Sequence, residues 1–494
     1  MIAVVLNDQA YEQDIRELLM AFYPGAELTH EKDPEAEFCI AGELSEDRKT
    51  FRLLLISRGE VEFKVCRYSR EERRELDVFD APIEVDYEDR TATKNKIKRR
   101  LYVILKARTG KSLPWGTLTG IRPVKIAESK LREGMSDAGF SDYMRTTYFT
   151  SEDKIALITE IAHKEERLLS ETDYAHGCSL YVGIPFCPTT CLYCSFTSFP
   201  ISRWSGRTGE YLGALFQEME YVAEKKKGCR LDTVYFGGGT PTSLSAEDLE
   251  LLLTRTEALF DLSEVKELTV EAGRPDSITR EKLAVLKKHG ITRISINPQT
   301  MKQETLDLIG RRHTVQQVKD CFLTAREMGF DNINMDLIVG LPEEGIEDLK
   351  ETMEQIRELN PDGITVHSLA IKRAARLNTM KEVYKDLKIE NTQEMIDLTA
   401  RCAREMGLEP YYMYRQKNMA GNFENVGYAA PGKECIYNIM IMEEKQTILA
   451  CGAGTTSKIL YPEENRIERE ENVKDVEQYI RRIGEMIGRK ERLL

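Results

Sequence analysis

The chain has 494 residues, 41% of them hydrophobic and 31% charged, so it is long enough for about two to four domains with large buried cores. Its 70 Lys and Arg residues against 83 Asp and Glu residues leave a formal net charge of −13, which gives no support to binding of nucleic acid or an anionic membrane. No apolar run approaches the ~18 residues of a membrane span, and no basic segment precedes the short apolar N-terminus. We therefore expect a cytoplasmic protein with no membrane partner.

Residues 1–110 are predicted to form a small α/β domain. Its strands are expected at 1–6, 36–42, 50–57 and 60–67, and its helices near 10–22 and 91–107. A segment rich in Gly and Pro follows at 113–123, and residues 123–170 have a helical pattern. We interpret 111–177 as a helical connector.

From Cys178 onward, strand-like and helical segments alternate regularly. This alternation predicts parallel strands with crossover helices. Six units are fewer than the eight of a closed barrel, so the expected fold is α/β, a partial (β/α)6 barrel over 178–380 with a C-terminal α+β extension over 381–494. The strands are predicted at 178–184, 232–236, 267–271, 292–296, 332–338 and 363–367, and the helices near 207–226, 246–259, 278–289, 314–328 and 345–358.

Eleven cysteines need an explanation, because an odd number in a reducing compartment does not make a disulfide framework. Eight of them are scattered and are interpreted as small buried apolar residues. These eight are Cys39, Cys66, Cys178, Cys229, Cys321, Cys402, Cys435 and Cys451.

The other three, Cys187, Cys191 and Cys194, follow the first predicted barrel strand with the spacing C-x3-C-x2-C. Three thiolates on one short loop can hold three irons of a 4Fe-4S cluster and leave the fourth iron open. The amino and carboxylate groups of S-adenosylmethionine chelate such an open iron. The alternative, a zinc site, needs a fourth nearby Cys or His, and none follows the third cysteine closely.

Further polar or Gly-rich motifs follow the later strands, where the ligands of parallel α/β sheets bind. Three consecutive glycines let the backbone approach a ligand closely, and a carboxylate at a strand end can accept hydrogen bonds from ribose hydroxyls. The motifs are Phe236-Gly-Gly-Gly-Thr-Pro241, Thr269-Val-Glu-Ala-Gly273, Ser295-Ile-Asn-Pro-Gln299, Gly310-Arg-Arg-His313 and Met335-Asp-Leu-Ile-Val-Gly-Leu-Pro342.

On these motifs the chain resembles the radical S-adenosylmethionine enzymes of the oxygen-independent coproporphyrinogen III oxidase family, and within it the HemZ-type coproporphyrinogen dehydrogenases. The family resemblance covers 178–460. The HemZ-type resemblance extends over nearly the whole chain, including 114–123 and 411–422.

The resemblance implies a role for each matching position. Cys187, Cys191 and Cys194 would ligate the cluster, flanked by Tyr181 and Tyr193. Gly238, Glu271 and Thr456 would line the S-adenosylmethionine on the cluster. The pocket of a second S-adenosylmethionine, which the family can hold, would consist of Gly239, Thr240, Gln299, Arg311, Asp336 and Ala370.

The implied activity is the oxidative decarboxylation of coproporphyrinogen III propionates to vinyl groups, giving protoporphyrinogen IX for haem biosynthesis. It uses a reductant such as flavodoxin or ferredoxin and needs no catalytic acid–base residue. The four substrate propionates require cations, and Arg suits them because it grips a carboxylate with two hydrogen bonds. The candidates are Lys372, Arg373, Arg376, Arg415 and Lys417.

Two positions differ from the well-characterised oxidases, which carry Cys in place of Phe196 and His in place of Gly183. The Cys-Ser-Phe ending resembles the haem-chaperone branch of the family. Two other functions therefore stay open: a haem-binding chaperone, and a different radical enzyme on a tetrapyrrole, such as a methyltransferase that opens haem.

Overall fold

A computed structural model describes residues 1–493 except 58–66, 79–80, 121, 171–172, 371–374, 385, 416–422 and 465. The chain divides into two compact units. Unit 1 comprises Met1–His163 and Tyr414–Glu424, and unit 2 comprises Lys164–Met413 and Asn425–Leu494. Within the described ranges, none of the helices has the length and apolarity that crossing a membrane requires.

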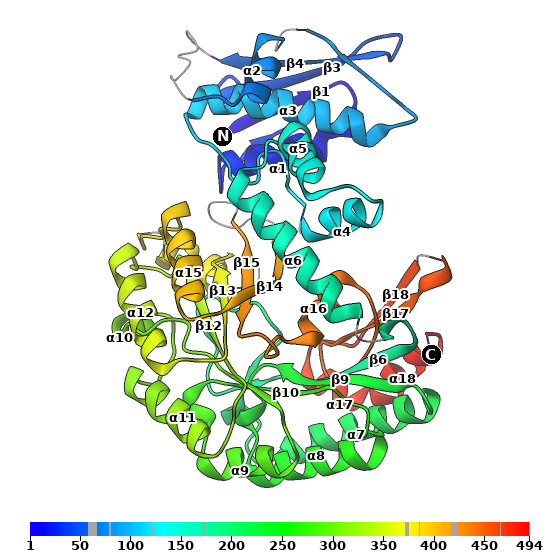
Figure 1. The fold of residues 1–494 in the computed structure, drawn as a ribbon, viewed down its shortest axis with the longest axis vertical. Coiled ribbons are helices and arrows are strands. Elements are labelled where there is room, and N and C mark those ends of the chain that lie inside the picture. Colours follow the sequence, from blue (N-terminus) through cyan, green and yellow to red (C-terminus); the bar gives the residue numbers. More distant parts are fainter. Residues whose placement is uncertain are drawn as a thin grey trace. The chain divides into compact units, whose positions relative to one another are not determined.

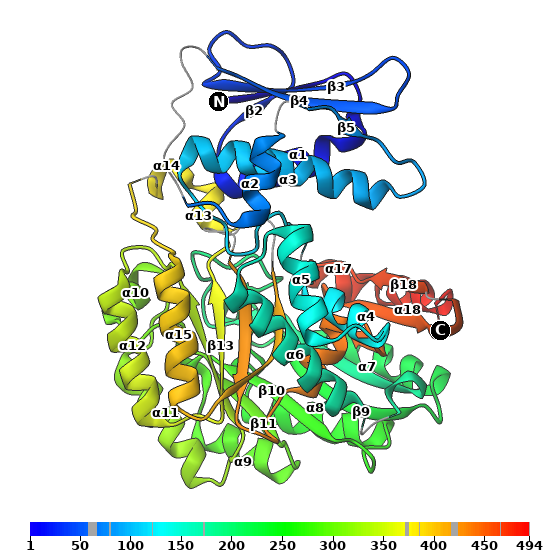
Figure 2. The same ribbon diagram turned by 45° about the horizontal axis from the view of Figure 1, so that its top comes forward.

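Unit 1 is built on a five-stranded sheet with the order β2-β1-β3-β4-β5. Helices α1 and α3 lie side by side against one face of this sheet (Figures 1 and 2). Apolar residues of the sheet and of both helices, such as Ile40, Leu18 and Leu101, form one buried core. The strands are β1 Ile2–Leu6, β2 Leu28–Thr29, β3 Phe38–Leu44, β4 Thr50–Ser57 and β5 Ile83–Glu84, and the helices are α1 Glu12–Phe22, α2 Arg70–Asp77 and α3 Arg90–Thr109.

The predicted N-terminal α/β domain is thus confirmed. The strand predicted at 60–67 lies, except for residue 67, outside the described residues. Helices α4 Val124–Arg132, α5 Asp137–Tyr148 and α6 Glu152–Ser170 confirm the helical pattern of 123–170.

Trp115, in the irregular segment rich in Gly and Pro, contacts residues of Tyr414–Glu424, the second chain segment of unit 1. The indole N–H of Trp115 donates to Glu424 Oε2 over 2.8 Å, and Lys154 donates to the other carboxylate oxygen over 2.6 Å. The Arg415 guanidinium lies 5.1 Å from the Trp115 ring centroid. Trp115 and Arg415 come from the two segments of the HemZ-type resemblance, 114–123 and 411–422, so these segments are in contact although they are far apart in sequence.

Unit 2 contains an eleven-stranded sheet with the order β14-β15-β13-β12-β11-β10-β9-β6-β16-β17-β18. Its middle consists of parallel strands in chain order, with crossover helices along the outside of the curved sheet (Figure 1). These strands are β6 Gly177–Ile184, β9 Arg230–Gly238, β10 Glu267–Gly273, β11 Arg293–Ile296, β12 Ile333–Val339 and β13 Gly363–Ser368. The helices are α7 Thr208–Lys225, α8 Ala246–Leu259, α9 Arg280–Lys288, α10 Gln303–Leu308, α11 Val315–Glu327 and α12 Ile346–Leu359. The predicted partial barrel is confirmed.

Strands from the C-terminal part extend this sheet at both edges. β15 Asn425–Ala429 pairs antiparallel with β13, and β14 Glu409–Tyr414 lies beyond it. β16 Thr447–Cys451 pairs parallel with β6, followed by β17 Thr456–Tyr461 and β18 Arg466–Glu471. The loop between β16 and β17 is thereby brought to the carboxyl end of β6, where the cysteine motif begins.

The remaining elements are short strands and helices. They are β7 Phe186–Cys187, β8 Phe199–Pro200, α13 Arg376–Thr379, α14 Lys381–Tyr384, α15 Gln393–Glu405, α16 Ile436–Glu443, α17 Val476–Arg481 and α18 Ile483–Glu491.

Candidate functional site

The three motif cysteines lie on one loop at the carboxyl end of β6, and all three are free thiols. Cys187 and Cys191 are buried and Cys194 is half-buried. The loop is held against the segment after α10, because Leu192 N–H donates to Ile309 O over 2.9 Å and Thr189 Oγ1 donates to Gly310 O over 2.8 Å. These two hydrogen bonds hold the cysteine loop in place without a disulfide.

The donor set fits a cluster better than a single zinc ion. Tetrahedral zinc with Zn–S bonds of about 2.3 Å needs sulfur atoms about 3.8 Å apart. Among the described Cys, His, Asp and Glu side chains, no group of three ligand atoms within 4.8 Å of one another contains these sulfurs. Sulfur atoms that are farther apart than zinc requires suit three irons, each with one thiolate ligand.

The surroundings of the thiols favour a bound cation. Burial raises the pKa of Cys187 to about 11, the Thr240 hydroxyl 3.4 Å away lowers it, and the neighbouring Cys191 and Cys194 raise it. Burial also raises the pKa of Cys194. Three thiolates on one buried loop need positive charge from a bound metal group to stay ionised.

Arg274 is a site residue that the sequence interpretation missed. Its side chain is 2% exposed, and Nη1 donates to Thr189 Oγ1 over 2.6 Å and lies 3.9 Å from Cys191 Sγ. The same guanidinium grips Asp276 through two hydrogen bonds of 2.9 and 2.6 Å. Its signal in the sequence was its position directly after the motif that ends at Gly273, at the end of the third barrel strand.

The glycine motif lies against the end of β6. Gly238 has φ +109°, which an L side chain rarely adopts. A Cβ atom on Gly239 would come within 2.5 Å of Phe186 O, and the Gly239 N–H donates to Ile184 O over 2.8 Å. Glycine is therefore required here for the close approach of two backbones, beside any contact with a ligand.

Glu271 lies at the carboxyl end of β10 and accepts two hydrogen bonds. Tyr235 OH donates to Oε1 over 2.7 Å, and the Gly238 N–H donates to Oε2 over 3.2 Å. Burial raises the pKa of Glu271 to about 7; the Tyr235 hydroxyl opposes this rise, and the charge of Asp336 adds to it. The carboxyl group is thus fixed in position, and its raised pKa makes the ionised form less favourable than for an exposed glutamate.

Three tyrosine rings stack beside this carboxylate. The Tyr235 centroid lies 5.9 Å from that of Tyr181 on β6 and 4.5 Å from that of Tyr437 on α16. Nothing in the sequence around Tyr437 indicates that its ring stacks on Tyr235, because the helix that carries it lies more than 160 residues beyond Glu271.

A cavity of about 290 Å³ opens at the carboxyl ends of β6 and β9. It brings together three residues that the resemblance assigned to the cluster and its S-adenosylmethionine, namely Tyr181, Gly238 and Thr456. Phe196, which follows the third cysteine, also lines it and is 77% exposed. Glu271, the remaining residue predicted to line this S-adenosylmethionine, reaches the region through its hydrogen bond with Gly238.

Of the residues predicted for a second S-adenosylmethionine, Gln299 follows β11, Asp336 lies within β12, and Arg311 lies in the segment after α10. The Gln299 backbone has φ 72°, and its N–H donates to Asp336 O over 3.0 Å. Arg311 donates to Tyr193 OH over 3.3 Å, and to Asn297 O. Gln299 and Arg311 are 7% and 5% exposed, and within the described ranges Gln299 Oε1 and Arg311 Nε have no hydrogen-bond partner. Buried polar atoms in this state need a partner from outside the chain, either ordered water or a polar ligand.

The other members of this set have different surroundings. Burial opposes ionisation of Asp336, but His367, Arg293 and Asn334 together hold its pKa below the ordinary value. Thr240 lies beside Cys187, and Gly239 precedes it. Ala370 follows β13 and directly precedes residues that the structure does not describe.

Two of the five cations predicted to hold substrate propionates, Arg376 and Arg415, are among the described residues. Lys372, Arg373 and Lys417 lie outside the described residues, and Arg376 is exposed at the start of α13. Arg415 is buried in unit 1, where Nη1 donates to Leu118 O over 2.9 Å and to Gly120 O over 3.3 Å. A guanidinium occupied in this way does not support the hypothesis that Arg415 holds a substrate carboxylate.

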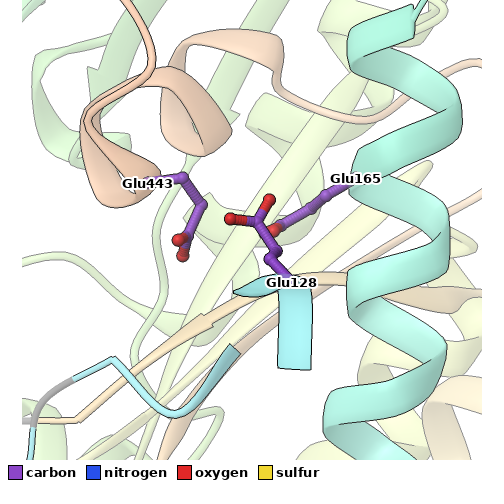
Figure 3. Close-up of side chains that lie close together, drawn as sticks. All are labelled: Glu128, Glu165 and Glu443. Carbon is purple, nitrogen blue, oxygen red and sulfur yellow. The ribbon is translucent and has the colours of Figure 1, made fainter. Parts of the chain in front are cut away.

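Two acidic side chains of unit 2 are also close together. Glu165 on α6 and Glu443 on α16 are buried, and a carboxylate oxygen of one lies within 4.8 Å of an oxygen of the other (Figure 3). Both have further interaction partners, so their proximity alone assigns no metal.

Comparison with known proteins agrees with this geometry. A family model described as the Radical SAM superfamily matches residues 181–356. The chain is 39% identical over 478 residues to the oxygen-independent coproporphyrinogen-III oxidase-like protein HemZ of Bacillus subtilis, covering 96% of this chain and 93% of the relative. It is 33% identical over 279 residues to the heme chaperone HemW of the same organism, covering 56% of this chain and 69% of that protein.

The fold is similar to a solved structure as well. The coproporphyrinogen III oxidase HemN from Escherichia coli, described as a radical SAM enzyme, superposes with a TM-score of 0.52 at 23% sequence identity. The match covers 66% of this chain and 73% of that chain. It shows a shared fold.

Proposed function

The chain belongs to the HemZ-like, oxygen-independent coproporphyrinogen III oxidase-like proteins of the radical SAM superfamily, and from this premise we propose that it converts propionate side chains of coproporphyrinogen III to vinyl groups. Each conversion removes one hydrogen atom, one electron and one molecule of carbon dioxide from a propionate. Two conversions give protoporphyrinogen IX, a step of haem biosynthesis.

One observation carries this proposal: three free thiols follow the first parallel strand, on a loop that continues into the wall of the cavity lined by Tyr181, Gly238 and Thr456. Membership of the superfamily implies a 4Fe-4S cluster and S-adenosylmethionine. When bound, this pair supplies a 5'-deoxyadenosyl radical that takes a hydrogen atom from an unactivated carbon.

The chain's own residues position these groups and keep water away. Cys187, Cys191 and Cys194 hold the cluster, and the Arg274 guanidinium places positive charge beside Cys191. Glu271, fixed by Tyr235 and Gly238, accepts from the ribose hydroxyls. The stacked tyrosine rings form an apolar wall that excludes solvent from the reacting carbon.

The buried polar atoms of Gln299 and Arg311 support a second S-adenosylmethionine at the neighbouring strand ends. In this proposal, Asp336, Gly239, Thr240 and Ala370 complete its pocket. The external partners are a tetrapyrrole substrate and a one-electron reductant such as flavodoxin or ferredoxin.

A second candidate function is a haem chaperone. It is favoured by the similarity to HemW and by Phe196, whose exposed ring at the cavity offers an apolar surface to a flat tetrapyrrole. A ring in this position suits bound haem as well as bound coproporphyrinogen, so turnover has to separate the two functions.

The decisive experiment gives coproporphyrinogen III and S-adenosylmethionine to the anaerobically reconstituted, reduced protein. We expect the mono-vinyl intermediate followed by the di-vinyl product, with one deoxyadenosine and one carbon dioxide formed per propionate lost. Unchanged coproporphyrinogen, together with stoichiometric haem binding, would replace this proposal with the chaperone function.

A further inference from the structure

Two cysteines outside the site described above are in direct contact. Cys178 at the start of β6 is buried, Cys229 directly before β9 is half-buried, and their sulfur atoms are 2.6 Å apart. Both thiols are also near one backbone carbonyl, that of Arg230, at 3.6 Å from Cys178 and 4.0 Å from Cys229. The sequence interpretation treated both as separate packing residues. The parallel pairing of β6 with β9, which brings Gly177 opposite Arg230, is what places them together.

We propose that Cys178 and Cys229 form a reversible dithiol–disulfide pair whose oxidant is a low-molecular-weight disulfide. The two side chains differ in the way that such a pair requires. Cys229 keeps access to solvent and serves as the attacking thiol, whereas Cys178 is shielded and serves as the resolving thiol.

The electrostatic surroundings agree with these roles. The hydrogen bond between the two thiols lowers the pKa of Cys229; burial and Asp232 oppose this, and Lys226 and Arg230 add to it. The same hydrogen bond, together with burial, raises the pKa of Cys178. The thiolate is therefore favoured on the more exposed sulfur.

The chemistry is a two-step thiol–disulfide exchange. The Cys229 thiolate attacks one sulfur of the oxidant, the disulfide bond of the oxidant breaks, and the first small thiol leaves. The Cys178 thiol then loses its proton and attacks Cys229 Sγ, and the second small thiol leaves. Overall, two protein thiols are oxidised by two electrons to one disulfide, and one small disulfide is reduced to two thiols.

The position of the pair separates it from the cluster loop. Cys178 begins β6 and the first cluster cysteine follows its end, so the strand places roughly 20 Å between the two thiol groups. The loop that the disulfide closes contains all three cluster cysteines and α7. Oxidation therefore links the N-terminal ends of the first two barrel strands and leaves the cluster thiols free to hold iron.

The test treats the anaerobic, cluster-loaded protein with oxidised glutathione, blocks the remaining thiols with N-ethylmaleimide and digests the protein with chymotrypsin. Cleavage after Tyr181 separates Cys178 from the cluster cysteines. We expect a peptide pair cross-linked through Cys178 and Cys229 that disappears on treatment with dithiothreitol. A wild-type protein in which both thiols remain alkylated, or in which Cys229 keeps glutathione, overturns the proposal.

Single variants test the two roles. Cys178→Ser should leave Cys229 as a stable mixed disulfide with glutathione, because the resolving thiol is gone. Cys229→Ser should leave Cys178 unmodified, because the thiol that remains is the buried one. Cys321→Ser is the matched control, since Cys321 is half-buried on α11, and it should form the cross-link at the wild-type rate. A cross-link that forms equally well without Cys178 or Cys229 would assign the disulfide to other cysteines.

Discussion

The hydroxyl group of Tyr235 donates a hydrogen bond to Glu271 Oε1 over 2.7 Å. Since burial raises the pKa of Glu271 to about 7, its charge changes in the neutral range. We expect the affinity of the cluster-loaded protein for S-adenosylmethionine to rise as the pH increases through 7, because the ionised carboxylate is the better acceptor for ribose hydroxyls. Equilibrium binding measured between pH 6 and 8 checks this.

Glu271→Gln should weaken that binding about ten- to a hundredfold at pH 8 and make it independent of pH, because a hydrogen bond to a charged group contributes roughly 1.5–3 kcal/mol. Iron and sulfide content should not change. Equal affinity in the wild type and the variant would remove Glu271 from the cofactor site.

The same carboxyl group affects folding stability. The folded state binds the Glu271 proton more tightly than the unfolded chain, so between about pH 4.5 and 7 the contribution of this group to stability falls as the pH rises. Glu271→Gln should therefore gain stability relative to the wild type as the pH increases across this window. Urea unfolding at several pH values measures the difference, and a constant difference would contradict the raised pKa.

The second prediction concerns the cluster ligands. Changing Cys187, Cys191 or Cys194 to Ala should abolish the broad visible absorption of the reconstituted protein, because each change removes the protein ligand of one iron. Wild-type protein should hold about four irons and four sulfides. Cys321→Ala and Cys402→Ala are controls that should keep the cluster. Loss of the cluster in either control would show that the ligand set extends beyond the motif.

The third prediction concerns Arg274, which lies 3.9 Å from Cys191 Sγ. Arg274→Met removes positive charge beside the cluster, so the cluster should become harder to reduce and its midpoint potential more negative. In Arg274→Lys the midpoint potential should lie between those of Arg274→Met and the wild type, because the positive charge is kept. The geometry of the cysteine loop should not be restored, because an ammonium group cannot make the paired hydrogen bonds to Asp276. A redox titration of both variants distinguishes the roles, and unchanged potentials would assign Arg274 to packing alone.

The sequence predicted the middle of unit 2 well because the relevant signals are local. Each parallel strand is a short apolar run that is followed by Gly or polar residues. The spacing of Cys187, Cys191 and Cys194 by itself indicates three thiolate ligands of an iron–sulfur cluster. Their place at the carboxyl end of β6 follows from the rule that parallel α/β sheets carry function at that edge.

Pairings between distant segments were not predictable in the same way. The sequence predicted an α+β extension over 381–494, but not that 447–451 pairs with β6 and brings Thr456 to the cavity. Tyr437 reaches Tyr235 only because α16 lies beside β9, and Cys229 reaches Cys178 only through the register of two strands. Such contacts depend on the topology of the sheet, which short-range patterns do not encode.

The last prediction concerns the ion pair between Lys490 on α18 and Glu218 on α7, whose charged atoms are 2.7 Å apart with both side chains 0% exposed. Glu218 also accepts from the Gly452 N–H over 2.8 Å, next to the loop that lines the cavity. Lys490→Met should destabilise the protein by about 3–5 kcal/mol in urea unfolding, because it leaves a buried charge without its partner.

The double variant Glu218→Gln with Lys490→Met removes both charges and keeps an oxygen that accepts from Gly452. It should be clearly more stable than the sum of the two single changes predicts, since neither charge is then left alone in the core. The solvent-exposed pair of Arg482 and Glu485 is the matched control, and its loss should change stability far less than Lys490→Met does, because water screens both charges. If the effects of the two buried changes on the free energy of unfolding simply add, water reaches the pair. In that case α18 stabilises unit 2 through packing and not through this ion pair.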